Sequence, residues 1–417
     1  MKKVHLVSLG CAKNLVDSEV MLGCLEQDGY RLVTDAEEAD LVLVNTCGFI
    51  RPAVEEAVDE ILGLAEIKGR HPDQRLVVTG CLVQRYGSEL AAELPEVDLF
   101  VGVDGVERIS ELVRGLADGA RTAPEVPPPR YLMDSRSPRR VSTPFFRSFL
   151  KITEGCSNRC TYCMIPSIRG DLRSRTIPDL VAEARRLEAS GVRELTLIAQ
   201  DLTAYGNDLD MATDLVSLVE ALLAGTGIPW IRLLYLYPAT VPDALLALMA
   251  SSPRITPYLD IPFQHVSDPV LARMHRRYRC RDLDELVDRI RGHLPGCALR
   301  TTLLVGFPGE TSRDVDMIID RLQSWRLDHV GVFQYQDEEG SAAFALDGKV
   351  AEEEKAERYA RVMEAQASIS WKKQQQYVGR VEPLLVEGLS RESDLLLEGR
   401  TRFQAPDIDG CVYITAG

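Results

Sequence analysis

Short apolar runs alternate with longer amphipathic stretches along the first part of the chain. The apolar runs are residues 4–9, 40–45, 75–79 and 98–103, and each has the length of a buried strand. Residues 17–28 and the stretch from Pro52 to about Lys68 have helical spacing, and Pro52 suits a helix start. This alternation predicts an N-terminal doubly wound α/β domain over residues 1–120.

A second series of strands and helices occupies residues 145–375. The predicted strands are 148–153, 194–199, 230–235, 257–261, 300–305 and 329–333. The predicted helices between them are 178–189, 213–223, 243–249, 283–293 and 312–324, and a long charged helix follows at 351–377. Six strand–helix repeats predict a parallel sheet rolled into a partial (βα)6 barrel, which is smaller than the closed eight-stranded form.

The segments around this barrel differ in character. Residues 121–144 are rich in proline and mixed charges and have no apolar period, so they predict an interdomain linker. Residues 377–417 contain three short strands, 381–386, 395–398 and 412–415, separated by glycines. They predict a small C-terminal β-barrel. Because the sequence ends just after the third strand, we expect this module to be incomplete.

Composition and charge narrow the function classes. The 417 residues are 45% hydrophobic and 27% charged, which is typical of a globular protein and excludes wholesale disorder. There are 48 Lys and Arg against 63 Asp and Glu, and this net charge of −15 argues against a surface that binds nucleic acid throughout. The apolar runs are too short to span a bilayer, and His5 and Ser8 interrupt the first of them. We therefore expect a cytoplasmic protein without a membrane segment.

The strongest chemical motif is Cys156-x3-Cys160-x2-Cys163, just beyond the first strand of the second domain. The ten cysteines of the chain are too sparse for a disulfide scaffold, and clustered cysteines in a reducing compartment more often bind metal or do redox chemistry. Three thiolates in one loop can ligate three irons of a [4Fe–4S] cube and leave the fourth open. The alternative is a zinc site completed by a distant residue.

Cys11, Cys47 and Cys81 are far apart in sequence, but each directly follows a predicted parallel strand. The ends of such strands share one edge of a sheet, so the three thiols are expected to converge and hold a cluster of their own. The alternative is that they are three unconnected buried thiols. The remaining cysteines have no partner by spacing, and we interpret them as structural: Cys24, Cys280, Cys297 and Cys411.

The C-x3-C-x2-C loop in a six-repeat barrel resembles the radical S-adenosylmethionine (SAM) superfamily. Residues 304–311, LVGFPGET, resemble the glycine segment that lies on the adenine side of SAM in that superfamily. The resemblance implies that SAM binds the open iron of the Cys156, Cys160 and Cys163 cluster and is cleaved there to a 5′-deoxyadenosyl radical. It also implies Gly306, Gly309 and Glu310 as residues on the SAM side.

With both triplets, the whole chain resembles the methylthiotransferases, which have a second [4Fe–4S] cluster, a radical SAM core and a C-terminal domain called TRAM. Residues 8–19 (SLGCAKNLVDSE), 165–170 (IPSIRG) and 200–206 (QDLTAYG) look like the branch that β-methylthiolates an aspartate of the twelfth small-subunit ribosomal protein. The resemblance implies two clusters and SAM as cofactors, that ribosomal protein, free or in the ribosomal particle, as the substrate, and separate sulfur and electron donors. One SAM would methylate a sulfur on the N-terminal cluster, and a second would generate the radical.

Other polar residues lie at predicted strand ends. Gln200 and Asp201 follow the second barrel strand, so we expect Gln200 to contact SAM or substrate and Asp201 to be catalytic, the alternative for Asp201 being a helix cap. His265 also lies at the barrel mouth, and a structural histidine is the preferred interpretation. The basic run formed by Arg169, Arg173 and Arg175 is interpreted as a solvated surface, with pairing to carboxylates of substrate or cofactor as the alternative.

Three other functions compete with this interpretation. A relative that modifies tRNA adenosines is the nearest, but residues 377–417 carry four arginines against seven carboxylates, and an RNA-binding module should be basic. We therefore expect a protein substrate rather than tRNA. The other two are a non-catalytic iron–sulfur or zinc interaction protein and a radical enzyme whose N-terminal cluster only transfers electrons.

Overall fold

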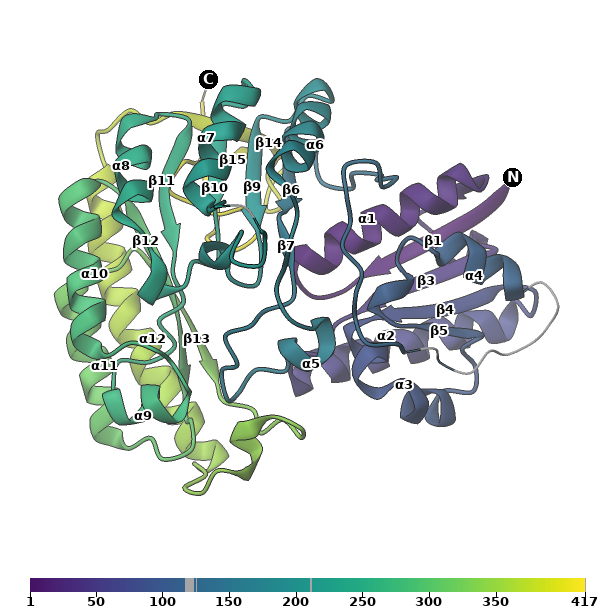
Figure 1. Cartoon of the computed structure of the whole chain (residues 1–417), viewed down its shortest axis with the longest axis horizontal. Helices are drawn as coiled ribbons and strands as arrows, with labels where there is room; N and C mark the ends of the chain where they lie inside the picture. The colour runs from purple at the N-terminus through teal and green to yellow at the C-terminus, as the bar shows by residue number, and fades with distance from the viewer. Residues whose placement is uncertain (117–123, 125, 211, 417) are drawn as a thin grey trace. The chain divides into compact units, whose positions relative to one another are not determined.

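The computed structural model (Figure 1) describes residues 1–116, 124, 126–210 and 212–416. The chain divides into two compact units. The first, which we call the N-terminal unit, contains Met1–Thr143, Lys151–Arg159 and Cys163–Glu183. The second, the barrel unit, contains Pro144–Leu150, Cys160–Tyr162 and Ala184–Gly417. The loop that carries the cysteine motif therefore contributes residues to both units.

A five-stranded sheet with the order β2-β1-β3-β4-β5 forms the centre of the N-terminal unit. Its strands are β1 (Lys2–Ser8), β2 (Tyr30–Leu32), β3 (Leu41–Thr46), β4 (Arg75–Gly80) and β5 (Leu99–Val101). All of the pairings are parallel, and β3 is buried along its whole length between β1 and β4. Such strands are apolar on both faces, which is why the sequence shows them as continuous Val and Leu runs.

Helices cover both faces of this sheet, and the expected doubly wound α/β fold is confirmed. The helices are α1 (Ala12–Gln27), α2 (Arg51–Arg70), α3 (Cys81–Glu93) and α4 (Ile109–Gly115), with short 3-10 turns η1 (Ala36–Glu38) and η2 (Val103–Gly105). In Figure 1, α1 and α4 pack together on one side, and α2 and α3 lie on the other side of the sheet. The strand order reverses between β1 and β3, and ligands of open α/β sheets bind at such a switch point.

The N-terminal unit also contains a small two-stranded sheet. Strand β7 (Thr153–Glu154) pairs antiparallel with β8 (Arg173–Ser174). Between them, the cysteine loop leads into the short helix α5 (Ile165–Arg169). Met164 and Ile168 pack in one apolar cluster with Cys81 and Val103 of the N-terminal α/β fold. This packing fixes α5 beside the carboxyl end of β4.

The barrel unit is organised by a six-stranded sheet with the order β13-β12-β11-β10-β9-β6. Its strands are β6 (Arg147–Lys151), β9 (Glu194–Ile198), β10 (Trp230–Leu233), β11 (Ile255–Asp260), β12 (Ala298–Val305) and β13 (His329–Gln334). The pairings from β9 to β13 are parallel. Helix α6 (Ile177–Ala189) begins in the N-terminal unit and continues into the barrel unit from Ala184 onward. The other helices are α7 (Leu215–Gly225), α8 (Asp243–Ser251), α9 (Asp268–Arg273), α10 (Cys280–His293) and α11 (Ser312–Trp325), with 3-10 turns η4 (Leu202–Ala204), η5 (Pro238–Thr240) and η6 (Ala342–Ala345). The expected partial (βα)6 barrel is confirmed.

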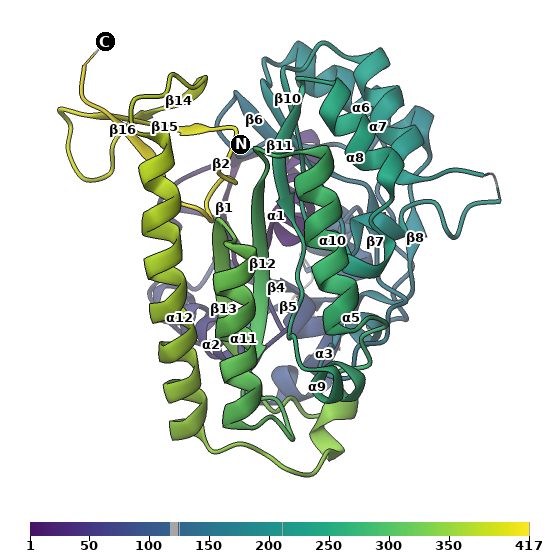
Figure 2. The same cartoon turned by 90° about the vertical axis from the view of Figure 1, so that its left-hand side faces the viewer.

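A long helix, α12 (Glu352–Gln374), leads from the barrel to the C-terminal sheet. It packs along α11 and β13, as Figure 2 shows, and ends in the 3-10 turn η7 (Gln375–Tyr377). The sheet contains β14 (Leu384–Leu389), β15 (Leu397–Thr401) and β16 (Val412–Ile414) in antiparallel order. Ala405, after β15, packs in one apolar cluster with Tyr258 and Ala298 of the barrel strands.

Sequence pattern and structure differ in a few places. Helix α1 starts at Ala12, five residues before the predicted start, because the inner face of its first turns is polar yet buried. Strand β2 and helices α3, α4, α5 and α9 were not predicted, and β2 has only three residues. Of the predicted linker, residues 121–123 and 125 lie outside the described residues. No helix in the described part of the chain is both long enough and apolar enough to cross a membrane.

Candidate functional site

Three cysteines follow three neighbouring strands of the N-terminal sheet. Cys11 lies between β1 and α1, Cys47 comes directly after β3, and Cys81 is the first residue of α3 directly after β4. Since β1, β3 and β4 are adjacent in the sheet, the structure places all three residues along one short stretch of its carboxyl edge. Cys11 and Cys47 flank the point at which the strand order reverses.

The backbone before Cys11 approaches Cys47 very closely. Gly10 has a φ of +90°, and a β-carbon at this position would lie 2.8 Å from the β-carbon of Cys47 and 3.3 Å from its sulfur. Only glycine adopts this conformation without strain and fits this space. Gly10 therefore brings the Cys11 loop and the Cys47 side chain together.

The three thiols have different electrostatic environments. Packing around Cys11 would raise its pKa, but the Lys13 ammonium and the backbone N–H of Asn14 outweigh this effect and hold the pKa below the usual value. Burial raises the pKa of Cys47 to about 11. Burial also raises the pKa of Cys81, although the Arg169 guanidinium opposes it. Of these three thiols, Cys11 therefore ionises most readily in the metal-free protein.

The donor set consists of three cysteine thiols at the ends of adjacent strands, and thiolates are the ligands of iron–sulfur clusters. Among the described residues, no three His, Cys, Asp or Glu side chains lie close enough together to hold one metal ion. A [4Fe–4S] cube is larger and holds its thiolates apart at separate corners. Three thiols on adjacent strand ends, with a glycine at the point of closest approach, fit such a cube. A structural zinc site would need four gathered ligands.

Arg169, at the end of α5, is buried beside this cysteine set. Its Nη1 donates to Asp17 at 2.6 Å and to Glu154 at 3.3 Å. Its Nη2 donates to the side-chain oxygen of Asn14 at 3.1 Å and to the sulfur of Cys81 at 3.4 Å. Lys151 bonds to both Asp17 and Glu154, so two cations and two anions form one buried network.

The expectation of a solvated basic run is wrong for two of its three arginines. Arg169 and Arg175 are buried, at 3% and 2% exposed. Arg175 pairs with Glu183 at 2.6 Å and with Asp179 at 2.7 Å. Arg173 is partly exposed and donates to backbone carbonyls, among them that of Asp171. The pattern was misleading because buried carboxylates elsewhere in the sequence balance these charges.

The second triplet lies in the loop between β7 and α5, and all three of its cysteines are half-buried. In the N-terminal unit, the sulfur of Cys163 accepts a hydrogen bond from the backbone N–H of Ile165 at 3.5 Å. In the barrel unit, the sulfur of Cys160 accepts one from Nη1 of Arg276 at 3.5 Å. The three thiols thus lie in a loop without regular secondary structure.

Arg276 contacts the second triplet and was not predicted from the sequence. Its guanidinium stacks on the rings of Tyr237 and Tyr278, 4.4 and 5.0 Å from their centroids. It also donates to the Tyr278 hydroxyl at 2.6 Å and to the carbonyl of Pro262 at 2.7 Å. These contacts aim a fixed positive charge at Cys160. The available signal was an arginine beside tyrosine in the stretch HRRYR at 275–279.

The glycine segment after β12 is shaped by its neighbours. Gly306 and Gly309 have φ of +73° and +86°, and β-carbons there would meet the side chains of Lys355 and Arg273. The Glu310 carboxylate is buried and accepts from the backbone N–H of Gly306 at 2.9 Å and from Arg358 at 2.9 Å. Glu310 therefore holds the turn in place, and its oxygens already have partners within the protein.

The remaining predicted residues also lie at the ends of barrel strands. Gln200 is half-buried just after β9. Asp201 is buried and caps η4, accepting from the backbone N–H groups of Thr203 and Ala204 at 3.0 and 3.2 Å. His265 is fully buried between the backbone N–H of Ser267 and Glu310, which agrees with a structural histidine.

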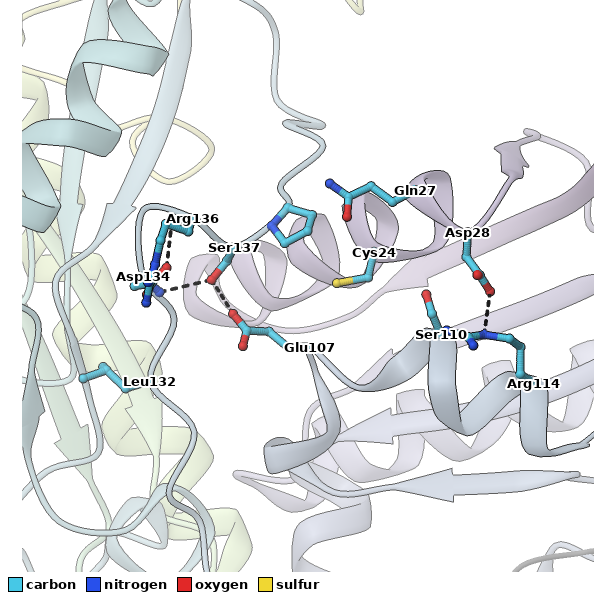
Figure 3. Close-up of a pocket in the computed structure, with 11 residues that line it drawn as sticks. Cys24, Gln27, Asp28, Glu107, Ser110, Arg114, Leu132, Asp134, Arg136 and Ser137 are labelled. Carbon is cyan, nitrogen blue, oxygen red and sulfur yellow. Dashed lines mark hydrogen bonds and ion pairs between the residues drawn. The ribbon is translucent and has the colours of Figure 1, made fainter.

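A polar pocket of about 520 Å³ lies apart from these cysteines in the N-terminal unit, between α1, α4 and residues 132–138 (Figure 3). Arg114 pairs with Asp28 at 3.2 Å, and the Ser137 hydroxyl donates to Glu107. Burial raises the pKa of Cys24 in its wall to about 11. Cys24, Cys280 and Cys297 are buried, whereas Cys411 is half-buried.

Family models match three segments of the chain. They are the uncharacterized protein family UPF0004 over residues 3–102, the radical SAM superfamily over residues 150–322 and the TRAM domain over residues 378–417. Among solved structures, the radical SAM methyltransferase TsrM from Kitasatospora setae aligns with a TM-score of 0.59 and 19% identity over 80% of this chain and 73% of that one. The cobalamin-dependent SAM radical enzyme OxsB aligns with a TM-score of 0.55 and 12% identity over 89% and 56% of the two chains. Both likenesses show the fold.

Sequence relatives are much closer. The ribosomal protein uS12 methylthiotransferase RimO of Desulfotalea psychrophila is 57% identical over 100% of this chain and 94% of that protein. The proteins of the same name from Pelobacter propionicus and Geobacter sulfurreducens are 49% and 48% identical over 100% of this chain and 92% and 93% of theirs. With this identity over its full length, the chain belongs to the ribosomal protein uS12 methylthiotransferase family.

Proposed function

We propose that this chain adds a methylthio group to the β-carbon of an aspartate in ribosomal protein uS12, with two [4Fe–4S] clusters and SAM. The observation that carries the proposal is that both cysteine triplets are present in a chain whose uS12 methylthiotransferase relatives align with it from end to end. A ribosomal protein as the substrate places the reaction in the cytoplasm. Separate proteins or small molecules supply the sulfur and the electron.

Each triplet has a distinct role in this proposal. Cys156, Cys160 and Cys163 hold the cluster that binds SAM, and the strand-end cysteines Cys11, Cys47 and Cys81 hold the cluster that carries the sulfur. When bound, these groups supply the radical that removes a hydrogen from carbon and the methylated sulfur that replaces it. A carbon–hydrogen bond beside a carboxylate has no leaving group, so polar substitution is not available for this step.

The chain's own residues orient these groups. Cys160 is held by Arg276, whose stacked guanidinium fixes the thiolate and offsets its charge. The backbone of the turn from Gly306 to Gly309, fixed by Glu310, offers a surface for SAM, and Gln200 lies at the end of the second barrel strand. Asp201 caps η4 and thereby fixes the backbone after Gln200, which is a positioning role.

The charge of the C-terminal module supports a protein substrate. Of its four arginines, Arg400 is buried in contact with Glu194 and Glu387, so it is not available to a phosphate backbone. Arg380 and Arg391 are exposed, and so are three of the seven carboxylates, Glu392, Asp394 and Asp407. The exposed charges of the module are thus slightly acidic, and it lacks the basic surface that a phosphate backbone needs, which disfavours tRNA.

Anaerobic reconstitution and product analysis test the proposal. The intact chain should bind about eight irons, and C11A/C47A/C81A and C156A/C160A/C163A should each bind about four. Only the first of these variants should still cleave SAM to 5′-deoxyadenosine, and neither should produce methylthiolated uS12. A methylthio mass on tRNA instead of uS12 supports the tRNA alternative. Bound zinc without SAM cleavage contradicts the enzyme function altogether.

A further inference from the structure

Arg169 has more donors beside the N-terminal cysteines than it has acceptors. Nη1 and Nη2 bond to Asp17, Glu154, Asn14 and Cys81, whereas Nε is buried and has no acceptor among the described residues. A buried donor without an acceptor costs about 1–3 kcal/mol. The guanidinium therefore has one N–H without an acceptor, and its Nη2 already contacts a cysteine of the expected cluster site.

The guanidinium is also held rigidly. Asp17 and Glu154 are themselves bonded to Lys151, and all four charged side chains are at most 3% exposed. If the Arg169 side chain turned toward solvent, Asp17 and Glu154 would each lose a cationic partner. Loss of a partner from a buried ionic network costs folding free energy. The distance of Arg169 to the Cys81 sulfur is thus set by the network and not by a flexible chain.

We propose that Arg169 is a positioning residue for the cluster held by Cys11, Cys47 and Cys81, and that it raises the reduction potential of this cluster by donating hydrogen bonds to its sulfur atoms. Hydrogen bonds to sulfur and nearby positive charge stabilise the more negative, reduced state of an iron–sulfur cluster. The proposal rests on the proposed function, because it requires a cluster at these cysteines.

Arg169 also lies close in sequence to the second triplet. Arg169 ends the helix that begins two residues after Cys163, and Met164 and Ile168 of the same segment pack with Cys81. The seven residues from Cys163 to Arg169 thus connect a ligand of one triplet to the electrostatic environment of the other. A change at Arg169 affects the N-terminal cluster directly, without removing any cluster ligand.

The test uses the full chain with only one cluster site. In the C156A/C160A/C163A background, the parent and the variants R169Q and R169K are reconstituted anaerobically, and the midpoint potential of the remaining cluster is measured by redox titration followed by electron paramagnetic resonance. R173Q is the matched control, because it removes the same charge from the same segment while Arg173 contacts backbone carbonyls. Iron content and circular dichroism are measured for each protein.

R169Q should make reduction at least tenfold less favourable, a shift of about 59 mV for one electron. R169K keeps the charge but lacks the forked donors, so its shift should be smaller than that of R169Q and larger than that of R173Q. If R169Q does not fold or does not bind iron, the potential of R169K is compared with that of the parent instead. A potential of R169K equal to that of the parent overturns the proposal. Equal potentials in R169Q and R173Q overturn it as well. A parent that binds no iron overturns both this inference and the two-cluster function, whereas an unchanged potential leaves that function standing.

Discussion

Replacing Arg400 by methionine should loosen the C-terminal sheet from the barrel strands. Arg400 is 1% exposed and donates to Glu194 at 2.6 Å and to Glu387 at 2.6 Å. Glu194, on β9, is fully buried and also accepts from Arg232 at 2.6 Å. The Arg400 side chain is thus a buried ionic link between β15 and the first residue of β9.

The magnitude follows from what each substitution leaves behind. Breaking a buried ion pair costs about 3–5 kcal/mol because the remaining charge is left without its partner. In R400M, Glu194 keeps Arg232, so we expect the lower end, about 3 kcal/mol. In E194Q, Arg232 and Arg400 both lose the charged acceptor, so we expect the upper end of this range.

Amide hydrogen exchange measured by mass spectrometry checks this estimate locally. A loss of about 3 kcal/mol corresponds to a roughly 100-fold larger open population, so peptides that cover β15 and residues 402–409 should exchange roughly 100-fold faster. The control is R391M, because Arg391 is exposed on the same module and surface substitutions change stability by about 0.5 kcal/mol or less. Exchange in R400M that equals exchange in R391M would refute the reasoning.

The same network predicts a pH dependence with a definite sign. Burial alone would raise the pKa of Glu194, but Arg232 and Arg400 outweigh it and hold the pKa below its usual value. A carboxylate with a lowered pKa in the folded state stabilises the fold above its unfolded pKa of about 4.3 and loses this contribution as the pH falls further. The stability gap between the parent and E194Q should therefore be constant above about pH 5.5 and shrink in acid. A gap that grows in acid contradicts this assignment.

Three further predictions concern the cysteines. G10A should reduce iron binding at the N-terminal site by more than half, because the added carbon meets Cys47 at 2.8 Å. Iron analysis in the C156A/C160A/C163A background measures this effect. In metal-free protein, the alkylation rate of Cys47 should rise about tenfold per pH unit between pH 7 and 10, whereas the alkylation rate of Cys11 should level off at a lower pH. Equal alkylation rates of the two thiols at pH 7.5 would contradict these pKa shifts. R276M should slow SAM cleavage about 10–100-fold through loss of the donor to Cys160, and a parental rate would exclude this role.

The strands and the strand-end cysteines were within reach of sequence reasoning. Runs such as residues 41–46 are apolar on both faces, so they indicate buried parallel strands without any tertiary information. The placement of Cys11, Cys47 and Cys81 directly after such runs was enough to predict that they share one sheet edge. The adjacency of β1, β3 and β4 is a result of the chain topology, which the sequence pattern does not specify.

The buried charges were not predictable in the same way. The first turns of α1 bury Lys13, Asn14 and Asp17, so the helix lacks the apolar stripe that marks a helix in sequence. The partners of Asp17, which are Lys151 and Arg169, come from segments more than 130 residues away. Periodicity cannot show that a distant opposite charge makes a polar position a buried one, and the same limitation hid Arg276.

The contact between Arg169 and Cys81 also sets an order of events during synthesis of the chain. The two residues are 88 positions apart, and ribosomes add roughly 5–20 residues per second, so Cys81 emerges roughly 4–18 s before Arg169. During that interval the N-terminal sheet can form with its three thiols in place but without the guanidinium that contacts Cys81. Insertion of iron before Arg169 emerges would have to proceed at an open sheet edge, whereas later insertion would have to pass a closed ionic network. The fold thus makes the timing of cluster loading relative to translation an experimentally accessible variable.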